Sequence, residues 1–357
     1  MRTFLCQCGN RVYFESVRCE ACGRALGFLP DTLTLHALEP DAQGGWQTLP
    51  EGRQCRSCAN AVQYEVCNWL VPAEDPVALC RACRLNRIIP DLSVPGHQDY
   101  WQRIESAKRR VLYTLLDLGL PVQSLEEDPQ QGLAFRFLAD ANAGSEFMEP
   151  VPGQPPVYTG HDLGVITLNL AEADDVARTR VRERLGERYR TLVGHFRHET
   201  GHYYWERLVN GTPRLAAFRK RFGDERLDYS QALQSHYNNG PPPDWQQHCV
   251  SAYAASHPWE DWAETWAHYL HMVDTLDTAR DYALSVRGSP IASRDESRDF
   301  ERLLEDWVRL GLLVNSLNRS LGMEDPYPFV LTDTVKEKLR FVHEVAAAPS
   351  ATSGTGA

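Results

Sequence analysis

The stretch RHETGHYYWERLV, residues 197–209, places two histidines four positions apart with a glutamate directly after the first. Side chains four positions apart lie on one face of an α-helix, so His198 and His202 can bind one Zn²⁺ together. Glu199 is rotated by about 100° from His198, which puts its carboxylate beside the metal, where it can accept a proton from zinc-bound water. The spacing therefore predicts a catalytic zinc site on a helix. The alternative is a chance match among the 12 histidines of this 357-residue chain.

The flanking sequence predicts that this motif belongs to one long helix, residues 174–209. Apolar side chains recur there at helical spacing, an aspartate at position 174 or 175 can cap the start, and Asn210-Gly211 marks the end. Gly201 leaves room for a close neighbour on this helix. His195, one turn before His198, is either a spare metal ligand or a solvated side chain.

Two histidines and a water leave a tetrahedral zinc ion one protein ligand short. Residues 256–273, SHPWEDWAETWAHYLHMV, predict a second helix with an apolar tryptophan-rich face and a face of glutamates and histidines. The alternative is an ordinary solvated stripe, but a stripe flanked by three tryptophans is a costly surface unless it faces something. The acidic and histidine side chains on this helix are Glu260, Glu264, His268 and His271.

These motifs resemble those of known zinc peptidases. HETGH followed by AETWAHY is similar to the gluzincin arrangement, in which a glutamate on a second helix completes the zinc site, and Glu264 stands in that place. Over most of residues 1–275 the chain resembles the bacterial zinc metallopeptidases that contain zinc ribbons. The matching stretches are CQCGNRVYFESVRCEACG, CNWLVPAEDP, CRLNRIIPDLS, AKRRVLYTLLDLGLPV, HETGHYYW, FGDERLDYSQAL, HYNNGPP and HPWEDWAETWAHYLH.

The resemblance implies a zincin-like α+β fold and a protease-like zinc site held by His198, His202 and Glu264. Glu260, one helical turn earlier, is the alternative ligand, with Glu264 then acting on the site as its partner. For the oxyanion of the reaction, a positioned donor is needed. Tyr253, His257 and Tyr237 are the candidates for this donor. His268 is a candidate to orient one of the zinc ligands without binding the metal itself.

Nine of the ten cysteines precede residue 84, which in a cytosolic chain indicates metal binding rather than disulfides. In residues 1–30 two short pairs flank a strand-like segment, which predicts a zinc ribbon; a disulfide arrangement is the alternative. The second cluster, in residues 50–92, has one cysteine too many for a tetrahedral site. Spacing alone selects Cys55, whereas the family resemblance makes Cys67 an equal choice. The first site is formed by Cys6, Cys8, Cys19 and Cys22, and the secure members of the second are Cys58, Cys80 and Cys83.

Composition bounds the partners of the protein. The formal net charge is −11, and residues 1–90 contain nine arginines, no lysine and nine acidic residues. Nucleic-acid binding relies on clustered basic side chains, so we do not expect it, although zinc ribbons often serve that purpose. The sequence shows no apolar signal segment and no stretch of about 20 apolar residues, so we expect a cytoplasmic protein without a membrane span. The oligomeric state is not predicted.

Outside these motifs, the pattern predicts helices at residues 97–119 and 300–322 and strands at 133–140 and 156–170. Residues 165–170 are either an ordinary core strand or the cleft edge that pairs with an extended substrate. We therefore expect two cysteine modules, a mainly helical zincin-like domain at residues 97–345 and a disordered tail at 346–357. Lone Cys249 is expected to be a small buried side chain.

The sequence as a whole predicts hydrolysis of a peptide or protein substrate at a catalytic zinc ion, with Glu199 as general base and one or two further structural zinc ions. The alternative is a non-catalytic module, in which the ribbons bind a protein partner and the zincin-like part is a scaffold. A fourth protein ligand closing the HETGH site, such as His195 or His268, would favour the scaffold.

Overall fold

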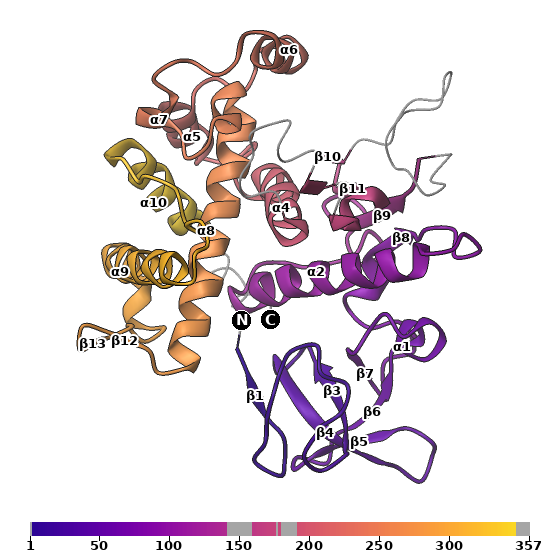
Figure 1. The fold of residues 1–357 in the computed structure, drawn as a ribbon. Helices are drawn as coiled ribbons and strands as arrows, with labels where there is room; N and C mark the ends of the chain where they lie inside the picture. Colours follow the sequence, from indigo (N-terminus) through magenta and orange to yellow (C-terminus); the bar gives the residue numbers. More distant parts are fainter. Residues whose placement is uncertain (1, 141–158, 176–177, 180–190, 348–357) are drawn as a thin grey trace. The chain divides into compact units, whose positions relative to one another are not determined.

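The computed structural model describes residues 2–140, 159–175, 178–179 and 191–347. It divides into two compact units, residues 2–196 and residues 197–357 (Figure 1). The N-terminal unit is rich in β-structure and the C-terminal unit is almost entirely helical. None of the helices in the described ranges is long and apolar enough to cross a membrane.

The cysteine-rich part of the N-terminal unit consists of two antiparallel sheets. A two-stranded hairpin carries the first cysteine pair, and a five-stranded sheet has its strands in chain order. Strand β3 also bridges to the residues just before β7, where Phe28 pairs with Trp69, and these two rings lie 4.9 Å apart in the core. The elements are β1 Phe4–Leu5, β2 Arg11–Val12, β3 Ala25–Leu29, β4 Thr34–Pro40, β5 Trp46–Leu49, β6 Gln54–Ser57, α1 Ala59–Tyr64, β7 Leu70–Pro72 and η1 Cys83–Leu85.

The rest of the N-terminal unit is a long helix with a mixed four-stranded sheet of order β10-β11-β9-β8. The expected helix at 97–119 and strand at 133–140 are present as α2 and β9. Strand β11 pairs with β9 on one side and β10 on the other, so it is an interior strand. The idea that residues 165–170 offer a free edge to substrate is therefore wrong. The elements are β8 Asn86–Ile88, α2 His97–Asp117, β9 Ala134–Leu138, β10 Gly160–Asp162, β11 Val165–Asn169 and η2 Leu170–Ala173.

Helix α2 carries a charged cluster into the interior of this unit. Lys108 and Glu105 are both fully buried, and the Lys108 ammonium lies 2.8 Å from the Glu105 carboxylate. Asn86 of β8 donates to the same carboxylate at 2.7 Å. The ammonium also lies over the rings of Phe135 and Phe137, at 5.4 and 5.5 Å from their centroids. Every charge that α2 buries here is thus paired, as burial in an apolar interior requires.

In the C-terminal unit the helices pack around the long helix α8 (Figure 1). The core beside it is aromatic, and Trp262 and Trp266 are completely buried. The elements are α4 Leu192–Leu208, α5 Leu215–Phe222, α6 Tyr229–Asn239, α7 Trp245–His248, η3 Tyr253–Ser256, α8 Pro258–Asp281, β12 Ser285–Val286, β13 Ser289–Pro290, η4 Glu296–Arg298, α9 Phe300–Ser320 and α10 Asp333–Ala347.

Two of the expected boundaries differ from the structure. The helix predicted over 174–209 is not continuous, because Thr191 is non-helical and its hydroxyl accepts from the Gly194 amide at 2.9 Å, capping the start of α4. Residues 176–177 and 180–190 of that prediction lie outside the described residues. The predicted disordered tail begins too early, since α10 continues to Ala347, and the remainder of it also lies outside the described residues.

Candidate metal centre

Helices α4 and α8 touch at the HETGH motif, and a glycine permits the contact. A Cβ atom placed on Gly201 would lie 2.9 Å from the Cα of Ala263, closer than real Cβ atoms approach backbone. The indole nitrogen of Trp262 donates to the carbonyl of Gly201 at 2.8 Å and fixes the two helices against each other. The predicted role of Gly201, to leave room for a neighbour, is confirmed.

This contact brings His198, His202 and Glu260 together. Their donor atoms form a group that could hold a metal ion. The Nε2 atoms of the two histidines are 3.2 Å apart. The Glu260 carboxylate lies 3.0 Å from Nε2 of His198 through Oε2 and 3.5 Å from Nε2 of His202 through Oε1. The Glu260 carboxylate thus faces both imidazoles, one through each oxygen.

Glu264 occupies a different position, on the far side of the His198 ring. Its Oε1 lies 2.7 Å from Nδ1 of His198, while its Oε2 accepts from the Ser251 hydroxyl at 2.7 Å. The structure therefore departs from the expectation that Glu264 joins the histidines as third ligand. The physical reason is that Glu260, one turn nearer the start of α8, reaches the Nε2 atoms, and Glu264 reaches only the opposite ring nitrogen.

The separations match those that a tetrahedral zinc ion imposes. Ligand atoms at about 2.0–2.1 Å from zinc and at tetrahedral angles lie about 3.3 Å from each other. The two Nε2 atoms are 3.2 Å apart, Oε2 of Glu260 lies 3.0 Å from Nε2 of His198, and the other oxygen, Oε1, lies 3.5 Å from Nε2 of His202. In addition, Oε2 of Glu260 is buried, and it lies 3.0 Å from Nε2 of His198. A buried carboxylate is costly unless a cation, here a protonated imidazole or a metal ion, lies against it. The donor set of two imidazoles and one carboxylate is the one that catalytic zinc sites use.

Electrostatics within the group favour bound cations. Burial opposes a charge on His198, but the carboxylates of Glu260 and Glu264 outweigh it and raise the pKa of the imidazole well above its usual value. Burial likewise opposes charge on Glu260, yet His202 and His198 hold the pKa of its carboxyl well below the usual range. Without metal the site thus holds a proton on His198 between two carboxylates, and a metal ion must displace that proton.

Two tyrosines lie around the metal group, and one of them was missed at the sequence level. Tyr229, the first residue of α6, donates its hydroxyl to Oε1 of Glu260 at 2.7 Å. The ring of Tyr253 lies 6.0 Å from that of His198. Burial first, and then neighbouring groups that include Glu260 and Glu199, raise the pKa of Tyr253. The buried Glu199 carboxylate therefore belongs to the same neighbourhood.

The remaining predicted site residues make other contacts. Nδ1 of His257 accepts from the Trp259 amide at 3.1 Å and so caps α8, while its Nε2 lies 3.2 Å from the carbonyl of Leu227. His268 pairs its Nε2 with the hydroxyl of Tyr327. The exposed Tyr237 lies on α6. Tyr229 and Ser251 were not among the residues predicted from the sequence, although Tyr229 lies within the family-like stretch FGDERLDYSQAL.

The first four cysteines form a metal-binding group near the N-terminus. Sγ atoms of Cys6 and Cys22 lie 3.6 Å apart, and those of Cys8 and Cys19 lie 3.7 Å apart. Disulfides require about 2.05 Å, whereas thiolates at about 2.3 Å from a tetrahedral zinc lie about 3.8 Å apart. The spacing of the sulfur atoms therefore fits zinc and excludes the alternative of disulfides within this group.

In the second cluster, Cys67 joins Cys58, Cys80 and Cys83, and all four are buried. Sγ atoms of Cys67 and Cys80 lie 3.6 Å apart, again the separation of two zinc ligands. Backbone amides donate to the sulfurs at 3.4 Å, from Trp69 to Cys67 and from Cys80 to Cys58. Cys55, the other choice at the sequence level, is instead buried among Leu29, Leu38 and Leu70.

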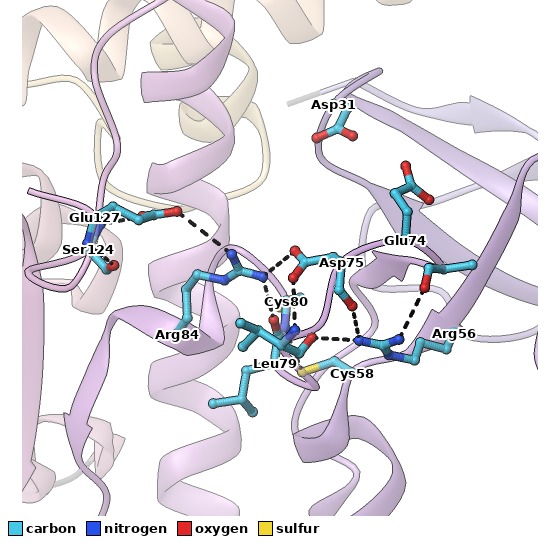
Figure 2. Close-up of polar contacts among 12 residues, drawn as sticks. Asp31, Arg56, Cys58, Glu74, Asp75, Leu79, Cys80, Arg84, Ser124 and Glu127 are labelled. Carbon is cyan, nitrogen blue, oxygen red and sulfur yellow. Dashed lines mark hydrogen bonds and ion pairs between the residues drawn. The ribbon is translucent and has the colours of Figure 1, made fainter.

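Arginines hold the segment around this cluster in place (Figure 2). Arg84 lies 2.6 Å from the Asp75 carboxylate and 3.7 Å from that of Glu127, and it donates to the carbonyl of Leu79 at 3.0 Å. Arg56 donates to the carbonyls of Asp75 and Val77, the latter at 2.9 Å. The loop that leads from β7 to Cys80 is thereby fixed before any metal contributes.

Helix α2 supplies a buried cation to the same cluster. Arg109 is 5% exposed and donates to the carbonyl of Val66, the residue before Cys67, at 2.6 Å. Burial opposes its charge, but Cys67, Glu105, Cys83 and Cys80 outweigh burial and raise the pKa of the guanidinium. A four-thiolate zinc site carries excess negative charge, and Arg109 offsets part of it.

Comparison with known proteins supports zinc binding by both parts of the chain. A family described as "Putative zinc-binding metallo-peptidase" matches residues 97–345, and a family described as "zinc-ribbon domain" matches residues 3–94. Proteins described as uncharacterized, one from Mycobacterium bovis and one from Mycobacterium tuberculosis strain H37Rv, are each 43% identical to the chain over 349 residues. The alignments cover 97% of this chain and 95% of each relative. No solved structure matches the chain.

Proposed function

Because the chain belongs to the family of zinc-binding metallo-peptidases with an N-terminal zinc ribbon, we propose that it hydrolyses peptide bonds at a zinc site formed by His198, His202 and Glu260. The observation that carries this proposal is that helices α4 and α8 bring two imidazole nitrogens 3.2 Å apart and place the Glu260 carboxylate 3.0–3.5 Å from them, the spacing of zinc ligands. In this proposal Glu260, not Glu264, is the third zinc ligand, and the helical part of the chain has a zincin-like fold.

Each residue of the site has a separate role. Zinc, when bound there, supplies a Lewis acid that polarises the scissile carbonyl and lowers the pKa of the attacking water to about 7. Glu264 accepts from Nδ1–H of His198, which leaves Nε2 free of a proton and aimed at the metal. Ser251 in turn holds the Glu264 carboxylate in place.

Glu199 is the general base in this proposal. It follows His198 on α4 and is 6% exposed, and its charge is felt by both Tyr229 and Tyr253 beside the metal group. Its carboxylate takes the proton from the attacking water and delivers it to the nitrogen of the leaving amine. Proton transfer of this kind contributes about 10²- to 10⁴-fold to the rate.

For the developing oxyanion, Tyr253 is the candidate that the contacts favour among the three considered. Its ring lies beside His198, and a protonated hydroxyl can donate a hydrogen bond to the carbonyl oxygen as charge builds up. His257 has both ring nitrogens engaged, one with the Trp259 amide and one with the Leu227 carbonyl, so it supports the start of α8 instead.

A fourth protein ligand that closed the site would favour the scaffold alternative. Within the described residues the metal group contains three donors, and neither candidate for a fourth belongs to it. His268 pairs with Tyr327, and Nδ1 of His195 lies 3.4 Å from the Glu172 carboxylate in the N-terminal unit. Three protein ligands with one position left for water are the arrangement of a catalytic zinc site, whereas structural sites are closed by four.

A matched pair of variants tests the proposal. Glu199→Gln removes the proton acceptor and leaves the three ligands, so it should keep its zinc and lose about 10²- to 10⁴-fold in rate on a substrate found by screening a peptide library. His198→Ala should lose activity together with zinc from this site. Equal rates for Glu199→Gln and the parent would refute the assigned mechanism. A parent that holds zinc here but cuts no peptide in the library would favour the scaffold.

A further inference from the structure

Tyr229 contacts the metal group directly, although neither the HETGH motif nor the proposed chemistry uses it. Its hydroxyl donates to Oε1 of Glu260 at 2.7 Å, the same carboxylate that meets both histidines. Because Glu260 is 1% exposed, water cannot easily replace this donor. A carboxylate that binds a metal through one edge needs a hydrogen-bond donor elsewhere to fix its rotation.

The surrounding contacts hold the Tyr229 ring in one place. Asp228 accepts from the Gln231 amide at 2.9 Å and caps α6, which makes Tyr229 the first residue of that helix. The ring packs against His257 and Trp259, with centroid distances of 5.2 and 6.0 Å.

His257 ties the two helix starts together. It accepts from the Trp259 amide at the beginning of α8 and contacts the Leu227 carbonyl just ahead of α6. The capping histidine of one helix therefore sets the position of the first residue of the other. This explains why the hydroxyl of Tyr229 arrives at Glu260, which lies in the first turn of α8.

We propose that Tyr229 is a positioning residue of the metal site, which acts through Glu260 to set the orientation and zinc affinity of that ligand rather than by touching substrate. The proposal rests on the zinc site proposed above. It assigns the site a donor on each carboxylate: Tyr229 on Glu260 and Ser251 on Glu264. Loss of such an outer hydrogen bond typically lowers metal affinity by about 10- to 100-fold.

The test is the affinity of the full-length protein for its third zinc ion, measured without any substrate. Parent and variants are equilibrated over a series of free zinc concentrations set by a chelator, and zinc per chain is counted by elemental analysis. Tyr229→Phe keeps the ring that packs on His257 and Trp259, and circular dichroism checks that helix content is unchanged. Its midpoint for the third zinc should shift by about 10- to 100-fold. The control Tyr282→Phe, at the exposed C-terminal end of α8, should not shift.

A second readout is the visible absorption of Co²⁺. The two cysteine sites are first filled with zinc, and Co²⁺ is then bound at the site of His198, His202 and Glu260. Tyr229→Phe should alter these bands, because the rotation of Glu260 changes, whereas a purely structural contribution of the ring would leave them as they are. An unchanged zinc midpoint and an unchanged cobalt spectrum in Tyr229→Phe would overturn the inference. Reduced turnover at an unchanged midpoint would also overturn it, since Tyr229 would then act on substrate.

These measurements separate the inference from the proposed function. A parent that takes up the third zinc but hydrolyses no peptide would refute the function, and the midpoint of Tyr229→Phe would still decide the role of Tyr229. A parent that binds no third zinc would overturn the metal site and the inference with it.

Discussion

The assignment of Glu260 as ligand and Glu264 as its neighbour can be tested by removing each carboxylate. Among the described residues, Glu260→Ala leaves His198 and His202 as ligands of this site, fewer than the three that catalytic zinc sites provide. Glu264→Ala keeps all three ligands and removes only the acceptor for Nδ1 of His198. The two variants should therefore differ in kind: the first loses the third zinc, and the second binds it more weakly.

The magnitude for Glu264→Ala follows from one contact. Its Oε1 lies 2.7 Å from Nδ1 of His198, the distance of a charge-assisted hydrogen bond. Such bonds contribute about 1.5–3 kcal/mol, and each 1.4 kcal/mol is a factor of ten in affinity. We thus expect about a 10- to 150-fold weaker third zinc, which agrees with the usual effect of losing a carboxylate behind a zinc-bound histidine.

The assay is equilibrium zinc binding over graded free zinc, with zinc per chain counted for the parent and both variants. At a free zinc concentration that saturates the third site of Glu264→Ala, the Glu260→Ala protein should still hold only the two ribbon zinc ions. The reverse order, with zinc lost from Glu264→Ala and kept by Glu260→Ala, would refute Glu260 as the third zinc ligand and restore Glu264 in that role.

Three further expectations concern the rest of the chain. The parent should carry about three zinc ions, Cys67→Ser should lose one of them, and Cys55→Ser should keep all three, as elemental analysis would reveal. Burial lowers the pKa of His268 to about 4 in the folded protein, whereas it is about 6.5 in the unfolded chain. Between pH 4 and pH 6.5 the imidazole is therefore protonated in the unfolded state and neutral in the folded state. Stability should therefore fall by up to about 3 kcal/mol as pH decreases from 6.5 to 4, and urea unfolding of His268→Gln should lack this slope. Gly201→Ala should destabilise the protein by up to about 2 kcal/mol in urea unfolding, because a clash of about 1–3 kcal/mol is offset by only about 1 kcal/mol of helix propensity, whereas Gly311→Ala, whose added Cβ meets nothing closer than 3.4 Å, should be neutral or stabilising.

Much of the architecture follows from patterns that the sequence displays directly. Apolar side chains at helical spacing locate α2, α9 and the start of α8 within a few residues, because each helix buries one face, whereas α8 continues to Asp281, beyond the stretch 256–273 predicted for it. The helix through HETGH was predicted to start too early. Thr191, inside the predicted range, caps the start of α4, and apolar spacing carries no information about such a cap. The sheet of β3 to β7 was not predicted, because its pairings join residues whose contacts depend on the whole unit rather than on local period.

For the second zinc cluster, the sequence offers five cysteines and no rule for discarding one. Cys55 and Cys58 have the spacing of a zinc knuckle, but they lie on a strand and at the start of α1 respectively. Side chains of a strand alternate between its faces, and pairing of β6 with β5 and β7 directs Cys55 into a cluster of leucines. Cys67 follows α1 and reaches the other three sulfurs. The selection is thus made by strand pairing, which is invisible to a count of spacings.

The same limit explains the exchange of Glu264 for Glu260. Both lie on one face of α8, one turn apart, so helical periodicity cannot rank them. Which carboxylate meets Nε2 of His198 and which meets Nδ1 depends on how far α8 has slid along α4, and one turn corresponds to about 5.4 Å. That offset is set by the contact of Gly201 with Ala263 and by the bond from Trp262 to the Gly201 carbonyl. A larger residue at position 201 should therefore disturb zinc binding without altering any ligand, because it moves both carboxylates relative to the same imidazole.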